Sequence, residues 1–469
     1  MLCPLSISRA YFFSVGLVVL VFPLVCCFPG PAGALVYWSS GLLVPRLPLL
    51  LVLWSHGLLV PWSAGHVCLH WAAAEFALHS DQTRPLLEPG LDQWLPLWKH
   101  WKPYLAEIRK GVAADVRTLV EEMQPEVDAW FQNLEPHVKL AYGSKTGTCT
   151  VKVPVIAKIA KMFGWQDDSL FQEMSSGFPL LGHINPGLGW RLRHDERYSD
   201  PVDLETFQAD NFQYVQKKLK QARVDPFWQT MAEEIAADVK AGRMEGPFAV
   251  PSSWSKETVA LPDYTHTAEL LPAPSCHEHT CFAFSVQQVG SDGRRKVRRA
   301  EDWRRSGGNK TVNVPDTPAY HSIEAFIAVI RALRHLGEEG AIATWGLDHE
   351  SAYRQLPVLR PADTYVVLQT PRGPTLWRHR VLMFGSVASV WGYCRVADWM
   401  AWASRCLLLT PALHFVDDFG APETCPEADT SFQYVQIRGC NPKRDLERGR
   451  GPTHPRIMLF AGTTFNPII

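Results

Sequence analysis

Apolar residues in several parts of the chain recur at the intervals of three and four that place them on one face of a helix. The pattern runs through residues 105–134, with an interruption at Pro125, and again through residues 207–243 and 322–336. Residues 387–409 form a longer apolar stretch of the same kind. The sequence therefore predicts helices over these four ranges.

Shorter runs that are rich in β-branched and aromatic residues predict strands between the helices. Within residues 281–289, phenylalanine and valine alternate with smaller or polar residues, as on a strand with one buried face. The other predicted strands are residues 248–250, 311–314, 364–369 and 376–383. Strands together with helices that can cover one face of a sheet indicate an α+β fold.

The first 65 residues differ from the rest of the chain. Residues 11–28 are almost entirely apolar, and residues 41–60 form a second apolar stretch that an arginine and a histidine interrupt. Such a length suits a short membrane span or the apolar part of a signal peptide. We interpret residues 1–65 as an apolar N-terminal extension, either a membrane anchor or a non-native segment. Residues 66–200 are interpreted as a helical preface followed by an irregular linker.

Composition narrows the class of protein. A chain of 469 residues is long enough for two or three domains. Its net charge of −1 excludes a protein that binds nucleic acid through a general positive field, so any such binding requires a local basic groove. Eleven cysteines without repeated spacing do not resemble a disulfide framework. They favour reduced thiols and an intracellular location, in the cytoplasm or the nucleus.

The most informative polar positions are Asp417 and Asp418, which stand side by side in the otherwise apolar residues 413–419. Burial of two like charges is costly unless a cation binds them. The turn residues that follow predict a hairpin with both carboxylates at its tip. Hard carboxylate oxygens suit Mg²⁺ or Mn²⁺ better than Zn²⁺. The simpler alternative is a solvated turn without a ligand.

A third carboxylate, Asp348, ends another mostly apolar run, as expected at the end of a strand. Three carboxylates from two strands can hold two divalent ions about 4 Å apart, the arrangement used for nucleotidyl transfer. Residues 343–358 around Asp348 resemble motif A of reverse transcriptases. The sequence Phe415-Val416-Asp417-Asp418 resembles the Tyr-x-Asp-Asp box of the same family, motif C.

Four further segments resemble motifs of this family and follow its order. Residues 296–305 together with Asn309 resemble the fingers motif, and residues 382–385 resemble motif B. Residues 439–443 resemble motif D, and residues 459–462 resemble the segment that leads into the primer grip. The resemblance covers the chain from about residue 207 to its end. It points to the polymerases of long-terminal-repeat or tyrosine-recombinase retrotransposons.

The resemblance implies a right-hand polymerase with fingers at residues 201–340 and a palm at residues 341–469. The palm would be an antiparallel sheet backed by helices. Because the chain ends just past the primer-grip segment, the thumb is expected to be largely missing. Residues 66–200 would then be either helices that pack on the polymerase or the remnant of an upstream capsid-like region.

The resemblance also assigns roles to residues. The catalytic residues, and the ligands of two Mg²⁺ or Mn²⁺ ions, would be Asp348, Asp417 and Asp418. The nucleotide-binding residues would be Lys296, Arg298, Arg299, Tyr353, Phe384, Gly385 and Lys443. The nucleic-acid-binding residues would be Arg304, Arg305 and Asn309. In this scheme the first three basic residues grip the triphosphate, the tyrosine excludes a ribose 2′-hydroxyl, and Lys443 assists the leaving pyrophosphate.

The implied function is that of an RNA-directed DNA polymerase, with a primed RNA or DNA template and deoxynucleoside triphosphates as partners. Two departures from the family pattern bear on this. Phe415 replaces the usual tyrosine of motif C, and Val390-Trp391 replaces the usual pattern of motif B. One alternative is a catalytically inactive retroelement relic that retains the fold and nucleic-acid binding. Another is a membrane-anchored protein with a cytosolic domain.

Two other motifs are weaker matches to known chemistry. Asp418-Phe419-Gly420 spells a metal-binding tripeptide of protein kinases, but no His-Arg-Asp segment precedes it. The segment from Cys276 to Cys281 offers four soft ligands, but side chains so close in sequence cannot all reach one zinc ion. The basic residues 294–305 could also be a solvated face. His349 and His414 are expected to be packing residues.

Overall fold

The computed structural model describes residues 98–143, 149–195, 198, 200–221, 223–251, 253–254, 270–274, 278–289, 295–335, 341–349, 351–425 and 427–435. Within residues 1–62 it describes only the backbone of six short strands. Backbone contacts divide the chain into two compact units, Met1–Ala73 and Ala74–Ile469.

The first unit contains three small antiparallel strand pairs. They are β1 (Tyr11–Phe12) with β2 (Val18–Val19), β3 (Val36–Trp38) with β4 (Gly41–Leu43), and β5 (Leu50–Leu53) with β6 (Leu59–Trp62). Most of the predicted apolar spans at residues 11–28 and 41–60 lie outside the described residues. Among the helices that are described, none has the length and apolar character needed to cross a bilayer.

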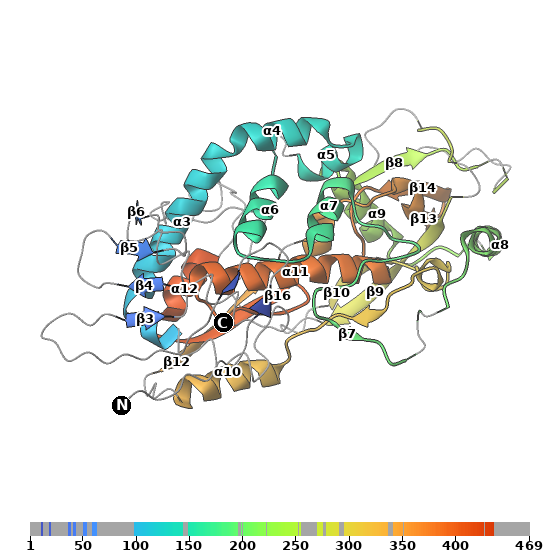
Figure 1. The fold of residues 1–469 in the computed structure, drawn as a ribbon. Coiled ribbons are helices and arrows are strands. Elements are labelled where there is room, and N and C mark those ends of the chain that lie inside the picture. The colour runs from blue at the N-terminus through green and yellow to red at the C-terminus, as the bar shows by residue number, and fades with distance from the viewer. Residues whose placement is uncertain are drawn as a thin grey trace, which may run out of the picture. The chain divides into compact units, whose positions relative to one another are not determined.

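A three-stranded antiparallel sheet lies in the second unit, with β16 in its centre. Its strands are β12 (Ile342–Asp348), β16 (Asp418–Thr424) and β15 (Leu413–Phe415), in that order. The surrounding helices are α10 (Ile323–His335), α11 (Val387–Leu408) and α12 (Glu427–Val435). The helices predicted at residues 322–336 and 387–409 are thus confirmed. Helix α11 runs through the middle of the unit (Figure 1). Most of its residues are buried, which explains why it is largely apolar.

The larger sheet has five strands in the order β10-β9-β13-β14-β8. Its strands are β8 (Met244–Phe248), β9 (Thr280–Val289), β10 (Arg295–Glu301), β13 (Tyr365–Thr370) and β14 (Gly373–His379). The sheet is mixed because β13 runs parallel to β9, whereas all other neighbouring strands of this sheet are antiparallel. Phe248 and Phe282 of this sheet form a buried apolar cluster with Val215. The two larger sheets that the structure describes are therefore one mixed sheet of five strands and one antiparallel sheet of three.

One sequence prediction about this region was wrong. Residues 311–314 do not form a strand. They follow the short helix η2 (Gly308–Lys310) and make one isolated bridge, before β11 (Asp316–Thr317) pairs with β7 (Arg191–Leu192). Strands β13 and β14 come after β12 in sequence yet belong to the larger sheet, and the domain boundary at residue 340 stays a prediction.

The helical pattern of residues 207–243 is divided between α8 (Leu204–Gln221) and α9 (Trp228–Lys240). Pro226 lies in the break, and the neighbouring Asp225 stabilises it. The Asp225 carboxylate accepts a hydrogen bond from the backbone N–H of Phe227 at 2.8 Å and another from Ser285 on β9. A proline next to a turn-forming aspartate is a common helix boundary, and the apolar periodicity alone does not reveal it.

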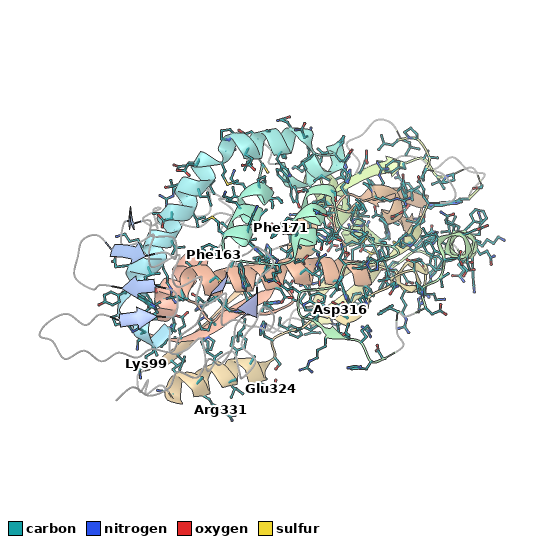
Figure 2. The ribbon with its side chains drawn as sticks, viewed as in Figure 1. Lys99, Phe163, Phe171, Asp316, Glu324 and Arg331 are labelled. Atoms are coloured by element: carbon teal, nitrogen blue, oxygen red, sulfur yellow. The ribbon has the colours of Figure 1, made fainter. Side chains whose placement is uncertain are left out.

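Helices before residue 177 cover one side of α11 (Figure 1). They are η1 (Lys102–Tyr104), α3 (Leu105–Glu122), α4 (Gln124–Asn133), α5 (Pro136–Tyr142), α6 (Val153–Met162) and α7 (Asp168–Ser176). The predicted interruption at Pro125 is confirmed as the junction of α3 and α4. Phe163 and Phe171 are both buried, and the Phe171 ring meets Trp399 of α11 edge to face (Figure 2).

Buried ion pairs fasten these helices to the rest of the unit. The Arg395 guanidinium of α11 binds the Asp167 carboxylate at 2.9 Å and also contacts Glu173 on α7. Arg109 of α3 binds Glu423 of β16 at 2.8 Å, with both side chains fully buried. Arg109 also donates to the Leu408 carbonyl oxygen at the end of α11. Of the two alternatives for this region, the structure supports helices that pack on the rest of the chain.

Replacement of Arg109 by methionine should strongly destabilise the protein. The buried Glu423 carboxylate would lose its counter-charge, and burial already raises the pKa of Glu423 even with Arg109 beside it. Loss of one partner of a buried pair costs about 3–5 kcal/mol. Urea unfolding followed by circular dichroism measures the change. The control is Arg193→Met, which removes a partly exposed pair with Asp195 and should cost at most about 1 kcal/mol. Equal losses in the two variants would contradict the assigned role of Arg109.

Candidate active site

The pairing of strands brings the three predicted catalytic aspartates to one place. Strand β12 pairs with β16 in a register that sets Asp348 directly opposite Asp418. Opposed residues of an antiparallel pair lie about 5 Å apart at their Cα atoms. The backbone N–H of His349 donates to the carbonyl oxygen of Asp417 at 2.9 Å, which ties the end of β12 to the same turn. Asp348 and Asp418, which are 70 positions apart in the sequence, therefore meet at the end of the smaller sheet.

The predicted hairpin is present, with Val416 and Asp417 between the paired residues Phe415 and Asp418. Val416 has φ 57°, a left-handed conformation that is a clear outlier for a β-branched residue. A two-residue hairpin turn commonly requires positive φ, which glycine supplies without strain. Backbone strain of this kind costs about 1–3 kcal/mol and persists only where the surroundings impose it.

The donor set at this turn fits a hard divalent cation. Asp417 is half-buried and Asp418 is exposed, so both are open to a ligand from solvent. Their oxygens are the ligands that Mg²⁺ and Mn²⁺ prefer. Among the side chains that the structure describes, no three His, Cys, Asp or Glu residues form a metal-binding group. The Asp348 side chain is outside that set, because only its backbone is described.

Aromatic rings lie beside the aspartate turn. Tyr353, in the short helix η3 (Ala352–Gln355), is buried, and its ring centroid lies 5.2 Å from that of Phe384 and 4.9 Å from that of Tyr393. Burial raises the pKa of Tyr353, and the nearby charge of Asp417 adds to the effect. The Phe384 ring is 40% exposed. Tyr353 and Phe384, which are both predicted to bind nucleotide, are thus neighbours, and the Phe384 ring faces solvent.

The three basic residues predicted to bind triphosphate do not share an environment. Lys296 and Arg298 occupy alternate positions of β10 and are exposed. Arg299, the next residue, is buried. Successive side chains of a strand point to opposite faces, so adjacent arginines cannot serve the same surface. Lys296 and Arg298 remain candidates.

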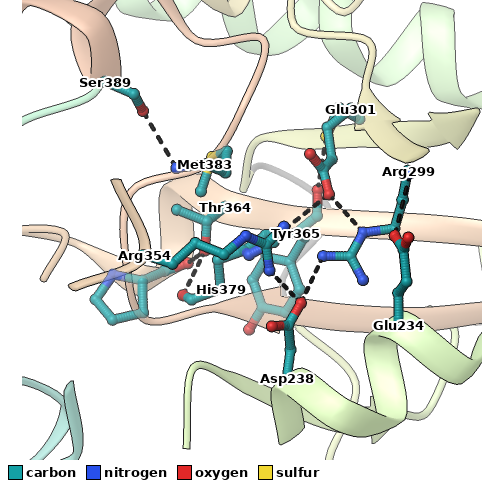
Figure 3. Close-up of polar contacts among 12 residues, drawn as sticks. Glu234, Asp238, Arg299, Glu301, Arg354, Thr364, Tyr365, His379, Met383 and Ser389 are labelled. Carbon is teal, nitrogen blue, oxygen red and sulfur yellow. Dashed lines mark hydrogen bonds and ion pairs between the residues drawn. The ribbon is translucent and has the colours of Figure 1, made fainter. Parts of the chain in front are cut away.

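Arg299 belongs to a buried ion-pair network (Figure 3). Its guanidinium lies 2.9 Å from Glu301 and 2.8 Å from Asp238 of α9. Arg354 of η3 also binds Asp238, and His379 of β14 lies 3.2 Å from Glu301. Burial alone would raise the pKa of Glu301, but Arg299 and His379 lower it to about 2. We therefore correct the prediction for Arg299: it holds the sheet to α9 and η3.

Asn309 also has a structural role that the sequence did not reveal. Its amide nitrogen donates to the Gly385 carbonyl oxygen at 2.9 Å, and its amide oxygen accepts from the backbone N–H of Val387 at 3.0 Å. Gly385 has φ 97°, and a Cβ atom there would lie 2.4 Å from the Glu301 carbonyl oxygen. Asn309 therefore holds the turn that requires Gly385. That it also contacts nucleic acid stays a prediction.

A groove of about 900 Å³ runs beside the larger sheet and reaches Gly385. Both Arg304 and Arg305 line it, as the sequence predicts for a nucleic-acid contact. Sequence reasoning missed three further lining residues, which are Lys218, Arg223 and Phe284. The first two lie at or just after the end of α8, where three lysines fall within four residues, and this cluster was the available signal.

Several predicted site residues cannot be placed. Lys443, with the rest of residues 439–443, and residues 459–462 lie outside the described residues. So do Cys276 and His277 of the candidate zinc segment. In the same segment, His279 is buried and hydrogen bonded to the Asp363 carbonyl oxygen at 2.7 Å. His349 and His414, expected as packing residues, are also buried.

Comparisons with known proteins add little. No known protein family matches the sequence, and no curated protein is similar enough to match. Among solved structures, the fold is similar to the protease-reverse transcriptase of prototype foamy virus, with a TM-score of 0.28 and 14% sequence identity. The match covers 45% of this chain and 22% of the viral one. A match with these values identifies no family.

The charge of Glu301 should stabilise the protein only above acidic pH. Its folded-state pKa of about 2 lies below the usual 4.5, so its contribution is complete above pH 4.5 and is lost as the pH falls towards 2. That pKa difference corresponds to about 3 kcal/mol. Urea unfolding from pH 3 to pH 7 should show Glu301→Gln destabilised by this amount at pH 7, with a gap that narrows on acidification. The exposed Asp195→Asn change serves as the control. A gap that does not depend on pH would refute the assignment.

Proposed function

We propose that the chain is an RNA-directed DNA polymerase, which extends a primer along an RNA or DNA template by nucleotidyl transfer. The observation that carries the proposal is the register that sets Asp348 opposite Asp418, with Asp417 tied to the same strand end. A solvated turn has no reason to meet a third aspartate from a distant strand. The order of the sequence motifs supports the same function.

In this proposal the smaller sheet with α11 is the palm, and the larger sheet is the main part of the fingers. Asp348, Asp417 and Asp418 would hold two Mg²⁺ or Mn²⁺ ions, which lower the pKa of an attacking hydroxyl and neutralise a triphosphate when bound. The chain's own contribution is to fix the carboxylates at the end of a rigid sheet. Tyr353 would contact the sugar of the incoming nucleotide, with Phe384 and Gly385 beside it. Lys296 and Arg298 would contact the phosphates, and Lys443 is retained as a candidate.

The groove beside the larger sheet would hold the single-stranded template. Arg304, Arg305 and Lys218 can contact phosphates along it, and the 40% exposed ring of Phe284 offers a surface on which a base can stack. Gly385 lines the groove and directly follows Phe384, one ring of the aromatic pair beside the aspartate turn. A strand in the groove would therefore lead towards the proposed catalytic centre.

Replacement of Asp417 by asparagine should abolish metal-dependent DNA synthesis. The substitution keeps the shape of the side chain and removes the negative charge that would hold a cation. Primer extension on an RNA template with Mg²⁺ should fall by at least about 100-fold, as for loss of one essential electrostatic group. Asp429→Asn, which changes an exposed acid on α12, should extend the primer as the wild type does. Equal extension by the Asp417 variant and the wild type would contradict the proposal. Absence of extension by the wild type would favour an inactive relic.

The groove predicts a salt-dependent affinity for single-stranded nucleic acid. In the double variant Arg304→Gln, Arg305→Gln, the slope of log affinity against log salt should decrease by about 0.7 for each lost phosphate contact. Fluorescence anisotropy with a labelled oligonucleotide at several salt concentrations measures the slope. The control Lys110→Gln, Arg117→Gln removes the same charge from exposed positions of α3 and should leave the slope unchanged. Identical slopes in both variants would exclude the groove as the binding site.

A further inference from the structure

We infer that His414 is a positioning residue for the aspartate turn. It is the middle residue of β15 and lies three positions before Asp417. Its side chain is fully buried between the smaller sheet and α11. The inference rests on the proposed function, because it explains how the chain holds the proposed metal-binding carboxylates in place.

The two ring nitrogens of His414 face two different oxygen atoms. Nε2 lies 2.8 Å from the Asp398 carboxylate on α11. Nδ1 lies 3.3 Å from the carbonyl oxygen of Val416, the residue with the unfavourable positive φ. The ring therefore faces both oxygens at once, with one nitrogen towards each. His414 thus connects the strained turn to the long buried helix beneath it.

A second hydrogen bond, from Trp190, holds the Asp398 carboxylate in the position where it meets His414. Its second carboxylate oxygen accepts a hydrogen bond from the indole N–H of Trp190, which comes from the irregular segment between α7 and α8. Trp190 is itself buried and packs against Trp391 of α11. The Asp398 carboxylate is therefore held in place by α11, which carries it, and by the hydrogen bond from Trp190. This fixed carboxylate in turn holds the His414 ring in the orientation that faces the Val416 carbonyl.

The backbone of His414 is equally constrained. Its N–H donates to the Nδ1 atom of His321, and its carbonyl oxygen accepts from the N–H of His321 at 3.0 Å. On its other side the ring stacks on Phe419, with centroids 5.5 Å apart. Rotation of the ring would break both side-chain contacts. The geometry supplies the external constraint that a β-branched residue at positive φ requires.

The Val416 carbonyl is close along the backbone to the proposed metal-binding carboxylates, so its position affects theirs. Asp417 directly follows the carbonyl group that His414 holds, and Asp418 directly follows Asp417. A change at the Val416 carbonyl therefore alters where both carboxylates point. Outer partners of this kind typically change metal affinity by about 10- to 100-fold when they are removed.

The test compares three variants of the full chain by hydrogen exchange and by Mn²⁺ binding. His414→Phe keeps an aromatic ring for Phe419 and removes both nitrogens. His414→Asn keeps an amide nitrogen near the position of Nδ1, so it can still donate to the Val416 carbonyl oxygen. His279→Phe removes another buried histidine, directly before β9 of the larger sheet, and controls for a general loss of stability.

Without metal, His414→Phe should speed amide exchange in residues 413–420 by about 10-fold, the effect of one lost charge-assisted hydrogen bond. His414→Asn should recover part of the protection because it keeps the contact with the Val416 carbonyl, and His279→Phe should leave this segment unchanged. Mn²⁺ affinity, measured by electron paramagnetic resonance, should fall in the same order. If residues 413–420 of the His414→Phe variant exchange at the same rate as in the wild type, the inference is overturned. If the wild type binds no Mn²⁺, the proposed function fails, whereas the exchange data still decide whether His414 holds the turn.

Discussion

The seven residue pairs between β12 and β16 set the position of the aspartates. A shift of one residue in this register would move the side chains of one strand to the opposite face and remove Asp348 from its place beside Asp418. Close packing at Gly420 opposes such a shift. A Cβ atom there would lie 2.7 Å from the Trp345 carbonyl oxygen and about 3.2 Å from the Phe326 ring of α10. Glu423, near the other end of β16, is fixed by Arg109. The register is therefore determined by contacts at both ends of the central strand.

The ion pair between Arg109 and Glu423 ties the helices before residue 177 to the smaller sheet. A buried carboxylate on a sheet strand is unfavourable unless a cation reaches it, and the cation here comes from α3. The same holds for Arg395 of α11, whose charge is met by acids at the start and within α7. Each of these pairs joins segments more than 200 residues apart in the sequence. Without the helices, charged groups of α11 and β16 would be left in an apolar interior.

The sequence predicted well those features whose signal is local. The hairpin at Asp417 and Asp418 was recognised because two charges interrupt an apolar strand, and α11 because its apolar pattern is long. Prediction failed where tertiary pairing decides the role of a residue. Arg299 was grouped with Arg298 because the basic run hid the alternation of β10. Glu301, two positions further on the same face, was the available signal that Arg299 is paired.

The roles of Asn309 and His414 depend on partners that no local pattern identifies. Asn309 binds backbone atoms on both sides of the Gly385 turn, more than 70 residues away. His414 has one partner close in sequence, the Val416 carbonyl, and its second partner lies on α11. Both residues stand next to functional candidates in the sequence. The resemblance to the fingers motif assigns Asn309 to nucleic acid, and His414 is predicted to be a packing residue. Neither interpretation includes the structural link that the folded chain makes.

A net charge of −1 is compatible with a basic groove because the acidic residues of the groove are engaged by the protein itself. Asp225 accepts backbone and side-chain hydrogen bonds from Ser285, and Glu301 is held by Arg299. Asp302 accepts from the backbone N–H of Arg305 at 3.1 Å. The side chain of Arg305 is 75% exposed, and its guanidinium lies 3.7 Å from the Asp302 carboxylate. The acidic and basic side chains of the groove therefore differ in how deeply they are buried. The acids are turned towards internal donors and the basic groups towards solvent, where an anionic strand can reach them.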